Sequence, residues 1–303
     1  MYDIIIVGGG PAGLTAAIYG LRAGKSVLVI EKNGFGGQIA YSPKVENIPG
    51  TISISGSEFA DKLTEQAMNL GAEVELENVV SVEDQGSVKV VTTEEGSTYE
   101  GKSVILAVGV KHRTLGLDGE QELIGKGISF CAVCDGAFYA GQETVMVGGG
   151  NSALQEALLL SEVCRKVTVV QNLPFFTGEK KLADALLTKE NVEVRFSTLV
   201  CGYEEKDGML TGVRVRGENG EEKVIPADGA FLAVGLIPEN AAFASLAKLD
   251  ERGYFDAGES CATATAGVFV AGDCRRKEIR QVTTAAGDGA IAAMAACRYL
   301  DQV

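Results

Sequence analysis

The chain has 303 residues, of which 46% are apolar and 22% are charged, and it carries a formal net charge of -14 with an isoelectric point near 4.7. This length allows two domains with sizeable cores. The acidic excess argues against nucleic acid or an anionic membrane as a partner, because both would repel the chain. No cleavable leader pattern and no apolar run of membrane-spanning length is present, so a cytoplasmic location is expected.

The N-terminal stretch has the order of a dinucleotide-binding unit. An apolar run at 3–7 predicts a strand, the glycine turn GGGPAG follows, and a helical pattern begins at Leu14. Gly8 would permit the tight turn, Gly10 would let a pyrophosphate approach the backbone, and Gly13 would let the helix pack closely on the strand. The alternative is a glycine-rich turn that holds no ligand.

A second predicted strand, Ser26–Ile30, ends in Glu31. A carboxylate at this position accepts hydrogen bonds from a ribose and repels a 2′-phosphate. The following loop, 36–50, is rich in glycine and polar amides that could line a cofactor. An amphipathic helix is predicted over Ser57–Leu70, and alternating strands from Val74 to Leu106 predict an antiparallel sheet. A linker is predicted over 111–119.

Two cysteines then stand two residues apart, in the sequence Cys131-Ala132-Val133-Cys134-Asp135. Such a pair closes a small disulfide, and at the start of a helix the thiol pKa is usually lowered. Asp135 is a candidate proton donor for the thiolate that is released. One alternative is half of a zinc site, although the other five cysteines stand alone and His112 is the only histidine. Another is a buried structural pair without redox chemistry.

The strand, glycine turn, helix and strand order occurs a second time, around the sequence GGGNSA. Gly148, Ala153 and Gln171 take the places of the first glycine, the third glycine and the acid. Neither an acid nor a basic side chain is present in 171–176, so a nicotinamide nucleotide site is predicted to be vestigial. Gln171 could still accept one ribose hydrogen bond, which leaves NADH open as an alternative.

The C-terminal part continues with a predicted helix over 182–187, alternating strands over 192–224 and a second linker around Pro238. A last strand in the sequence GVFVAGD ends in Asp273, and Arg280 precedes a long alanine-rich helix. Asp273 could bond a polyol chain, and the N-terminus of the helix could face the pyrimidine edge of a flavin. Solvated loops are the alternative at both places.

A series of motifs therefore runs along the chain: GGGPAG, GGQ, VENIPG, C-x-x-C-D, GGGNSA, GVFVAGD and RQV. In order and spacing they resemble the low-molecular-weight thioredoxin reductase family of flavoproteins. The resemblance implies an α/β fold of two Rossmann-like dinucleotide-binding domains of the three-layer ββα type, the second inserted into the first. The FAD-binding domain would comprise 1–115 and 240–303, and the pyridine-nucleotide-like domain with the cysteine pair would comprise 116–239.

The resemblance also implies roles for particular residues. Cys134 would face the isoalloxazine and take electrons from it, Cys131 would attack the disulfide of thioredoxin, and Asp135 would serve as acid and base. No metal site and a homodimer are expected. The implied FAD-binding residues are Gly8, Gly10, Pro11, Ala12, Gly13, Glu31, Lys32, Gly37, Gln38, Asn47, Val79, Gly109, Asp273, Arg280, Gln281 and Val282.

The chain departs from the family at the second strand end. NADPH-using members carry a histidine and three arginines where this chain has Gln171, Asn172, Leu173 and Thr177. Each lost charge-assisted bond to a 2′-phosphate weakens binding by about 1.5 to 3 kcal/mol. The pattern resembles ferredoxin-dependent flavin thioredoxin reductases, so reduced ferredoxin is the favoured electron donor.

Two alternatives to the ferredoxin hypothesis stay open. In one, NADH or another NAD(P)H donor reduces the flavin. In the other, which belongs to a different class, the chain is a flavin-binding redox sensor with a regulatory disulfide. The acidic balance of the chain counts against a ferredoxin donor, because ferredoxins are usually acidic too. Local basic clusters, such as Lys180-Lys181 and 275–277, could still form a docking patch.

Overall fold

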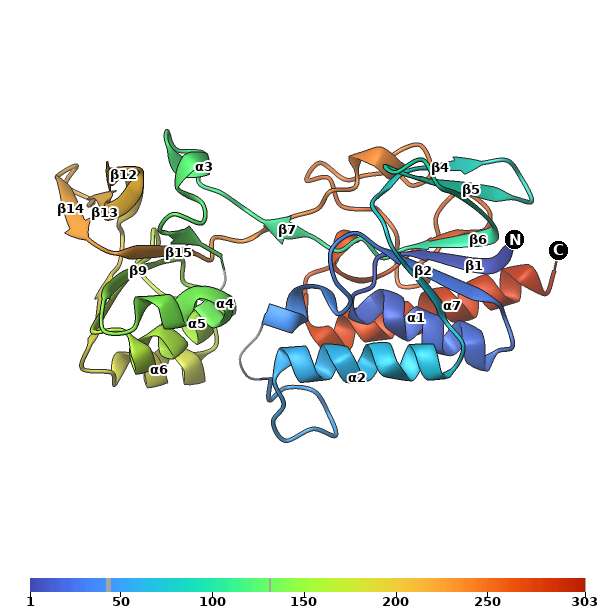
Figure 1. The fold of residues 1–303 in the computed structure, drawn as a ribbon, viewed down its shortest axis with the longest axis horizontal. Coiled ribbons are helices and arrows are strands. Elements are labelled where there is room, and N and C mark those ends of the chain that lie inside the picture. The colour runs from blue at the N-terminus through green and yellow to red at the C-terminus, as the bar shows by residue number, and fades with distance from the viewer. Residues whose placement is uncertain (42–44, 131, 303) are drawn as a thin grey trace. The chain divides into compact units, whose positions relative to one another are not determined.

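The computed structural model describes residues 1–41, 45–130 and 132–302, and the chain forms two compact units (Figure 1). Unit 1 comprises Met1–Lys111 and Ile237–Val303, and unit 2 comprises His112–Leu236. The boundaries expected from the sequence lay at 115/116 and 239/240. The connecting strands β7 (Lys111–His112) and β16 (Leu236–Ile237) pair with each other.

Unit 1 is built on one sheet in the order β3-β2-β1-β6-β5-β4, with β17 paired to β6. The central strands β1, β2, β6 and β17 are parallel, whereas β4, β5 and β6 are antiparallel neighbours. The strands are β1 (Tyr2–Val7), β2 (Val27–Glu31), β3 (Glu73–Leu76), β4 (Val79–Asp84), β5 (Lys89–Thr93), β6 (Thr98–Leu106) and β17 (Val268–Val270).

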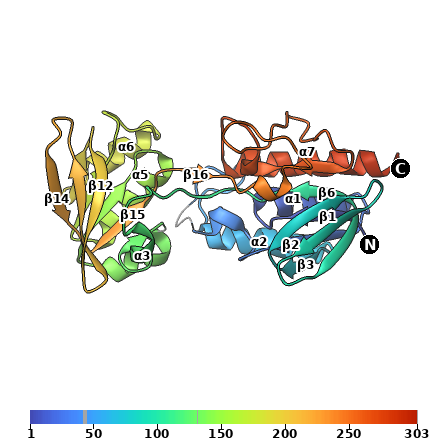
Figure 2. The same cartoon turned by 90° about the horizontal axis from the view of Figure 1, so that it is seen from above.

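Strand β1 shows how this sheet is covered on both faces. Its side chains alternate between the faces, so Ile4 and Ile6 enter one apolar cluster and Ile5 and Val7 enter another. The first cluster also contains side chains from the helices that cover one face of the sheet (Figures 1 and 2). The helices of unit 1 are α1 (Pro11–Arg22), η1 (Gly37–Tyr41), α2 (Gly56–Asn69), η3 (Ala241–Phe243), η4 (Gly272–Cys274) and α7 (Val282–Leu300).

Helix α7 lies directly against α1. A Cβ atom on Gly289 would stand 2.1 Å from the backbone oxygen of Ala12, so the two helices approach as closely as their backbones allow. The small residues Ala285, Ala292 and Ala293 are buried in the same cluster. This contact brings the N-terminal end of α1 together with the segment that precedes α7, although the two are far apart in the sequence.

The prediction of an antiparallel sheet over 74–106 is wrong for its first strand. β3 pairs in parallel with β2, with Val29 opposite Val74, whereas β4, β5 and β6 are antiparallel as predicted. The reason is the crossover: α2 connects β2 to β3, and a strand that follows such a helix returns beside its predecessor in the same direction.

Unit 2 contains a parallel sheet in the order β11-β10-β9-β15-β8 and a separate antiparallel sheet β12-β13-β14. The strands are β8 (Ile128–Ser129), β9 (Glu143–Val147), β10 (Lys166–Val170), β11 (Val192–Arg195), β12 (Leu199–Lys206), β13 (Met209–Arg216), β14 (Glu222–Pro226) and β15 (Gly229–Leu232). The helices are α3 (Glu120–Leu123), α4 (Ala132–Asp135), η2 (Gly136–Tyr139), α5 (Asn151–Val163) and α6 (Lys180–Leu187).

The predicted fold class, an α/β chain with two Rossmann-like units, is confirmed. In each unit the strand that precedes the glycine turn pairs in parallel with the strand that follows the next helix, as β1 does with β2 and β9 does with β10. Among the described residues, no helix combines the length and the apolar composition that crossing a bilayer requires.

Candidate functional site

The first glycine turn is shaped by close backbone contacts. Gly8 has a φ of 109°, and a Cβ atom there would lie 2.3 Å from the carbonyl oxygen of Ala107. At Gly13 a Cβ atom would lie only 1.9 Å from the carbonyl oxygen of Gly8. Both positions therefore require glycine, the first for its backbone conformation and the second for the contact between turn and helix.

Gly10 differs from its neighbours because a side chain there would meet little. The nearest atom to a Cβ atom on Gly10 is the Cα atom of Gly37, at 3.8 Å. Gly10 is the N-cap of α1, no side chain caps this helix end, and Pro11 occupies the first helical position. The amides of Ala12 and Gly13 therefore stand at an uncapped helix N-terminus, where a phosphate group binds favourably.

Glu31 ends β2 beside this turn. Its Oε2 accepts a hydrogen bond of 2.7 Å from the backbone nitrogen of Gly9, and its Oε1 accepts one of 3.0 Å from that of Asn33. An ionised carboxylate has about four acceptor positions, so it keeps capacity for the hydroxyl groups of a ribose. The neighbouring Lys32 is engaged differently, since its Nζ lies 3.0 Å from Oε2 of Glu239.

Asp273 lies in the short turn η4 that follows β17. Gly272, with a φ of 84°, packs this turn against the start of α1, because a Cβ atom there would stand 2.8 Å from that of Ala12. The Oδ1 atom of Asp273 is buried and has no hydrogen-bond partner among the described residues. Burial raises the pKa of this carboxyl, and Lys277 partly offsets the effect. An acceptor left in this state fits a ligand that brings a hydroxyl group.

The segment before α7 is hydrogen-bonded to the turn that carries Asp273. Nε of Arg280 donates to the carbonyl oxygen of Asp273 at 3.4 Å, and its guanidinium lies 4.2 Å from the ring centre of Tyr254. Gln281 caps α7, and its Oε1 accepts a hydrogen bond of 2.9 Å from Nδ2 of Asn47. Val282 is the first residue of the helix. The structure thus joins these predicted residues to Asp273 and to the loop that carries Asn47.

The remaining predicted cofactor residues are less closely joined. Gln38 lies in η1 and donates 3.3 Å to the carbonyl oxygen of Val110, next to Gly109, which has a φ of 64° and open space where a Cβ atom would be. Val79 begins β4 and packs with the apolar cluster that contains Ile30. The cradle that the contacts define is therefore made by the glycine turn, Glu31, Gly37 and the segments around Asp273 and Gln281.

The predicted redox motif is described only in part. Cys131 lies outside the described residues, and Cys134 and Asp135 belong to the short helix α4. Oδ2 of Asp135 accepts a hydrogen bond of 2.6 Å from Oγ of Ser129, at the end of β8.

Glu156 belongs to no motif of the sequence, although its carboxylate accepts a hydrogen bond of 3.2 Å from the backbone nitrogen of Ala132, between the two cysteines. Burial raises the pKa of Glu156 to about 7. A glutamate in the second turn of an amphipathic helix gives no sequence signal that distinguishes it from a solvated one.

The second glycine turn is closed over by the loop that follows β10. Gln171 is 4% exposed, its Nε2 donates to the carbonyl oxygen of Phe175 at 3.1 Å, and it lies against Gly149. The backbone nitrogens of Thr177 and Gly178 both donate to the carbonyl oxygen of Gly149, at 2.8 and 3.0 Å. The segment 171–178 contains no lysine or arginine, so a 2′-phosphate would meet no cation from this loop.

Four of the other five cysteines behave as core residues, and Cys201 is half-buried. Cys164, Cys261, Cys274 and Cys297 are buried, and burial raises the pKa of Cys261 to about 11 and of Cys274 to about 12. Thiols in such surroundings are unreactive. In the part of the chain that the structure describes, no group of three His, Cys, Asp or Glu side chains is arranged to hold a metal ion.

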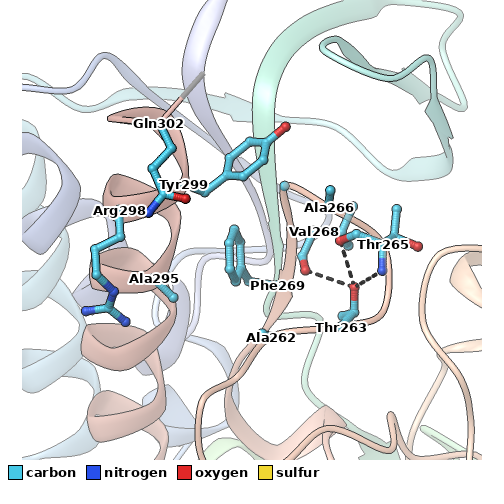
Figure 3. A pocket seen from close by; sticks show the side chains of 11 residues that line it. Ala262, Thr263, Thr265, Ala266, Val268, Phe269, Ala295, Arg298, Tyr299 and Gln302 are labelled. Atoms are coloured by element: carbon cyan, nitrogen blue, oxygen red, sulfur yellow. Dashed lines mark hydrogen bonds between the residues drawn. The ribbon is translucent and has the colours of Figure 1, made fainter.

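A hollow of about 330 Å³ lies elsewhere in unit 1, between 262–269 and the C-terminal part of α7 (Figure 3). Oγ1 of Thr263 in its wall already donates to the carbonyl oxygens of Thr265 and Val268, and none of the predicted cofactor residues lines it. It is therefore separate from the predicted cofactor residues.

The fold and the site together define a class. Two glycine turns of the dinucleotide-binding type, both at helix ends without a side-chain cap, are combined with a cysteine pair in the inserted unit. The first turn lies beside the η4 turn that carries Asp273, whose Oδ1 is buried. This is the organisation of a flavoprotein disulfide reductase. The family model described as "Pyridine nucleotide-disulphide oxidoreductase" matches residues 2–289.

Comparison with known proteins is consistent over the whole chain. Thioredoxin reductase of Listeria innocua is 41% identical over 100% of this chain and 95% of its own length, and that of Bacillus subtilis is 40% identical over 100% and 96%. The crystal structure of Lactococcus lactis thioredoxin reductase in its FR conformation matches with a TM-score of 0.97, 34% identity and full coverage of both chains.

The chain therefore belongs to the pyridine nucleotide-disulphide oxidoreductases and, within them, to the thioredoxin reductases. FAD is the cofactor of this family, as the sequence predicted. The open side of Gly10, the uncapped end of α1 and the buried Oδ1 of Asp273 fit a dinucleotide with phosphate and hydroxyl groups. This oxygen is ion-paired with Lys277 but has no hydrogen-bond partner among the described residues.

Proposed function

We propose that this chain is a flavin-dependent thioredoxin reductase, in which electrons pass from FAD to the Cys131–Cys134 disulfide and then to thioredoxin. The observation that carries the proposal is the identity of 41% to a thioredoxin reductase over the entire chain, with both cysteines and Asp135 present. The flavin cradle described above supports it, because the glycine turn would hold the pyrophosphate, Glu31 a ribose and Asp273 a hydroxyl of the polyol chain.

The chemistry assigned to the cysteine pair is thiol–disulfide exchange. The Cys131 thiolate attacks the disulfide of thioredoxin, which forms a mixed disulfide and releases one thiolate of thioredoxin. Cys134 then attacks Cys131, which restores the Cys131–Cys134 disulfide and releases the second thiolate. Asp135 supplies and later recovers the proton that a leaving thiolate requires. FAD, when bound, supplies the electron pair that reduces the disulfide again.

A single-turnover experiment tests this function. The chain is reduced with dithionite in the absence of oxygen, freed of excess reductant and mixed with oxidised thioredoxin, whose free thiols are then counted. We expect the wild-type chain to release two thiols per thioredoxin and Cys131→Ser to release none. Cys134→Ser should stop at the mixed disulfide, with one thioredoxin thiol released. Cys201→Ser is the matched control, since Cys201 is a free, half-buried cysteine in β12 and should leave turnover unchanged. Unchanged turnover in Cys131→Ser would refute the proposal.

For the electron donor, we propose reduced ferredoxin in preference to NADPH. The support is the segment 171–178, which has no cation and lies folded on the second glycine turn. The neighbouring Arg195 gives no substitute, because its Nε is held at 2.7 Å by Oε1 of Glu193. Loss of three cationic partners would weaken NADPH binding by several orders of magnitude. NADH is the second candidate, since it brings no 2′-phosphate and Gln171 could accept one hydrogen bond from its ribose.

Rapid mixing under anaerobic conditions distinguishes the candidate electron donors, with flavin absorbance as the signal. We expect reduced ferredoxin to bleach the flavin within a turnover time and NADPH at modest concentration to leave it oxidised. Bleaching by NADPH within that time would refute the ferredoxin proposal, and bleaching by NADH alone would establish the second candidate. The double variant Asn172→Arg with Leu173→Arg should gain affinity for NADPH, whereas Lys181→Arg adds no charge and serves as the control.

The docking site for ferredoxin needs a correction. The cluster 275–277 was predicted as a basic patch, but the side chains of Arg275 and Lys277 are only 11% and 9% exposed and are paired with Asp288. Lys180 is exposed yet pairs with Asp184. The prediction is wrong for Arg275 and Lys277, whose charges are already neutralised inside unit 1. A homodimer stays a prediction from the resemblance, which sedimentation of the purified chain would test.

A further inference from the structure

A buried charged cluster lies behind the flavin cradle. At its centre is Asp288 of α7, which is 4% exposed. Nε and Nη2 of Arg275 donate to its two carboxylate oxygens, each at 2.8 Å. Nζ of Lys277 donates to Oδ2 at 3.1 Å, and the backbone nitrogen of Gly272 donates to the same oxygen at 3.0 Å. One carboxylate thus binds two cations and one amide, all from the segment around Asp273.

These bonds fix the turn η4 to the middle of α7. Gly272 opens the turn that carries Asp273, and its amide is held by Asp288, sixteen residues further along the chain. The bidentate pair with Arg275 fixes the end of the same turn. A buried charge without such partners is costly, so removal of either partner leaves the other uncompensated. The orientation of Asp273 therefore depends on a network that does not itself belong to the predicted FAD-binding set.

Lys277 connects this network to Asp273 directly. Its Nζ lies 3.4 Å from Oδ1 of Asp273, the buried oxygen that has no hydrogen-bond partner among the described residues. The same ammonium lies 3.3 Å from Oγ1 of Thr284, which takes part in the capping box of α7 with Gln281. A single cation therefore bridges both acids and reaches the N-terminal turn of the helix.

The charges around Asp273 have opposing effects on its protonation. Burial raises the pKa of Asp273, Lys277 and Arg280 lower it, and Asp288 raises it. Arg275 offsets the charge of Asp288, because the two form a bidentate pair. Lys277 is accordingly the main group that favours the carboxylate form of Asp273.

We propose that Arg275, Lys277 and Asp288 are positioning residues for the cofactor: they fix the Gly272–Cys274 turn to α7 and hold the Asp273 carboxylate beside Lys277, as an acceptor for a hydroxyl group of FAD. The inference rests on the proposed function, since it assumes that FAD occupies the cradle. It assigns a role to three residues that the sequence suggested for another purpose or not at all.

The test is a titration of the full apo chain with FAD at a series of pH values between 5 and 8. Binding is measured by the quenching of flavin fluorescence. In Lys277→Met, Asp273 loses its nearest cation and takes up a proton at a higher pH, so it accepts the hydroxyl less well. We expect FAD affinity at pH 7 to fall about ten- to a hundred-fold, the loss of one charge-assisted bond. The pH at which affinity declines should also move upward.

Three control variants separate positioning from general damage. Lys277→Arg keeps the cation and should restore most of the affinity, and Lys62→Met, at an exposed ion pair on α2, should change nothing. In an Asp273→Asn background, Lys277→Met should have no further effect, because the acid that it positions is absent. A merely structural role would lower affinity equally in both backgrounds.

The outcomes also distinguish this inference from the proposed function. Wild-type chain that fails to bind FAD would overturn the proposed function. Wild-type chain that binds FAD while Lys277→Met binds it equally well at every pH would overturn the inference alone. If Lys277→Met does not fold, Arg275→Lys replaces it, since this variant keeps the charge and loses the bidentate geometry, and the same two results support or overturn the inference.

Discussion

Glu156 makes the stability of unit 2 depend on pH near neutrality. Its carboxyl lies beside helix α4, where it accepts a hydrogen bond from the backbone nitrogen of Ala132. Burial raises its pKa from the ordinary 4.5 to about 7, and that single hydrogen bond offsets the effect only in part. The folded chain therefore holds a proton on Glu156 at pH values where the unfolded chain has lost it.

The free energy follows from this difference in protonation. A pKa change from 4.5 to about 7 corresponds to about 3 kcal/mol. Because the folded state binds more protons than the unfolded state between these values, the free energy of unfolding falls as pH rises from 4.5 and levels off above 7. Glu156→Gln keeps an oxygen that can accept from Ala132 and removes the titration. Relative to the wild type, the variant should gain up to about 3 kcal/mol between pH 4.5 and 8.

Calorimetric melting of the full chain at a series of pH values measures this gain. The quantity compared is the difference between variant and wild type, so that all other titrating groups cancel. Glu162→Gln is the matched control, because Glu162 lies on the same helix, is largely exposed and pairs with Lys189 at the surface. A difference between Glu156→Gln and the wild type that does not change with pH would refute the reasoning.

Substitutions at Gly13, Gly10 and Glu120 test which of these residues serve stability and which serve FAD binding. Gly13→Ala places a Cβ atom 1.9 Å from the carbonyl oxygen of Gly8 and should lower the melting temperature of unit 1, whereas Gly10→Ala has room, should leave melting unchanged and should still weaken FAD binding in a fluorescence titration. Equal losses of stability in the two variants would contradict this assignment. Glu120→Ala removes a buried carboxylate that accepts hydrogen bonds from three backbone amides and from Tyr203, so it should destabilise unit 2 by about 3 to 5 kcal/mol in denaturant melts. A loss below 1 kcal/mol would show that water replaces those bonds.

The first glycine turn could be predicted from sequence because its constraints are local. The requirement for glycine at 8 and 13 comes from backbone atoms within a few residues or from the neighbouring strand, and the order of strand, turn and helix already implies them. The direction of β3 could not be predicted in this way. Its sequence, Glu-Val-Glu-Leu, alternates as an antiparallel strand would, and only the crossover through α2 decides that it pairs in parallel with β2.

The cluster 275–277 shows a second kind of limit. Three consecutive basic residues are most simply exposed, and the pattern gives no sign that an acid within an alanine-rich helix faces them. Asp288 lies between glycines 287 and 289, where small neighbours let Arg275 and Lys277 reach its carboxylate. The same close packing of α7 on α1 that needs Gly289 also buries the acid, so the ion pairs follow from a tertiary contact rather than from the local sequence.

Gln171 shows how sequence and structure combine on the question of the donor. The sequence establishes that the loop after β10 lacks cations, which concerns only a 2′-phosphate. The structure adds that the Gln171 amide is buried and already donates to the carbonyl oxygen of Phe175, so its placement is fixed by the protein itself. A ribose would have to compete with this internal bond or bind the remaining acceptor. The cost of that exchange applies to NADH as well as to NADPH, whereas a protein that delivers electrons directly to the flavin does not incur it.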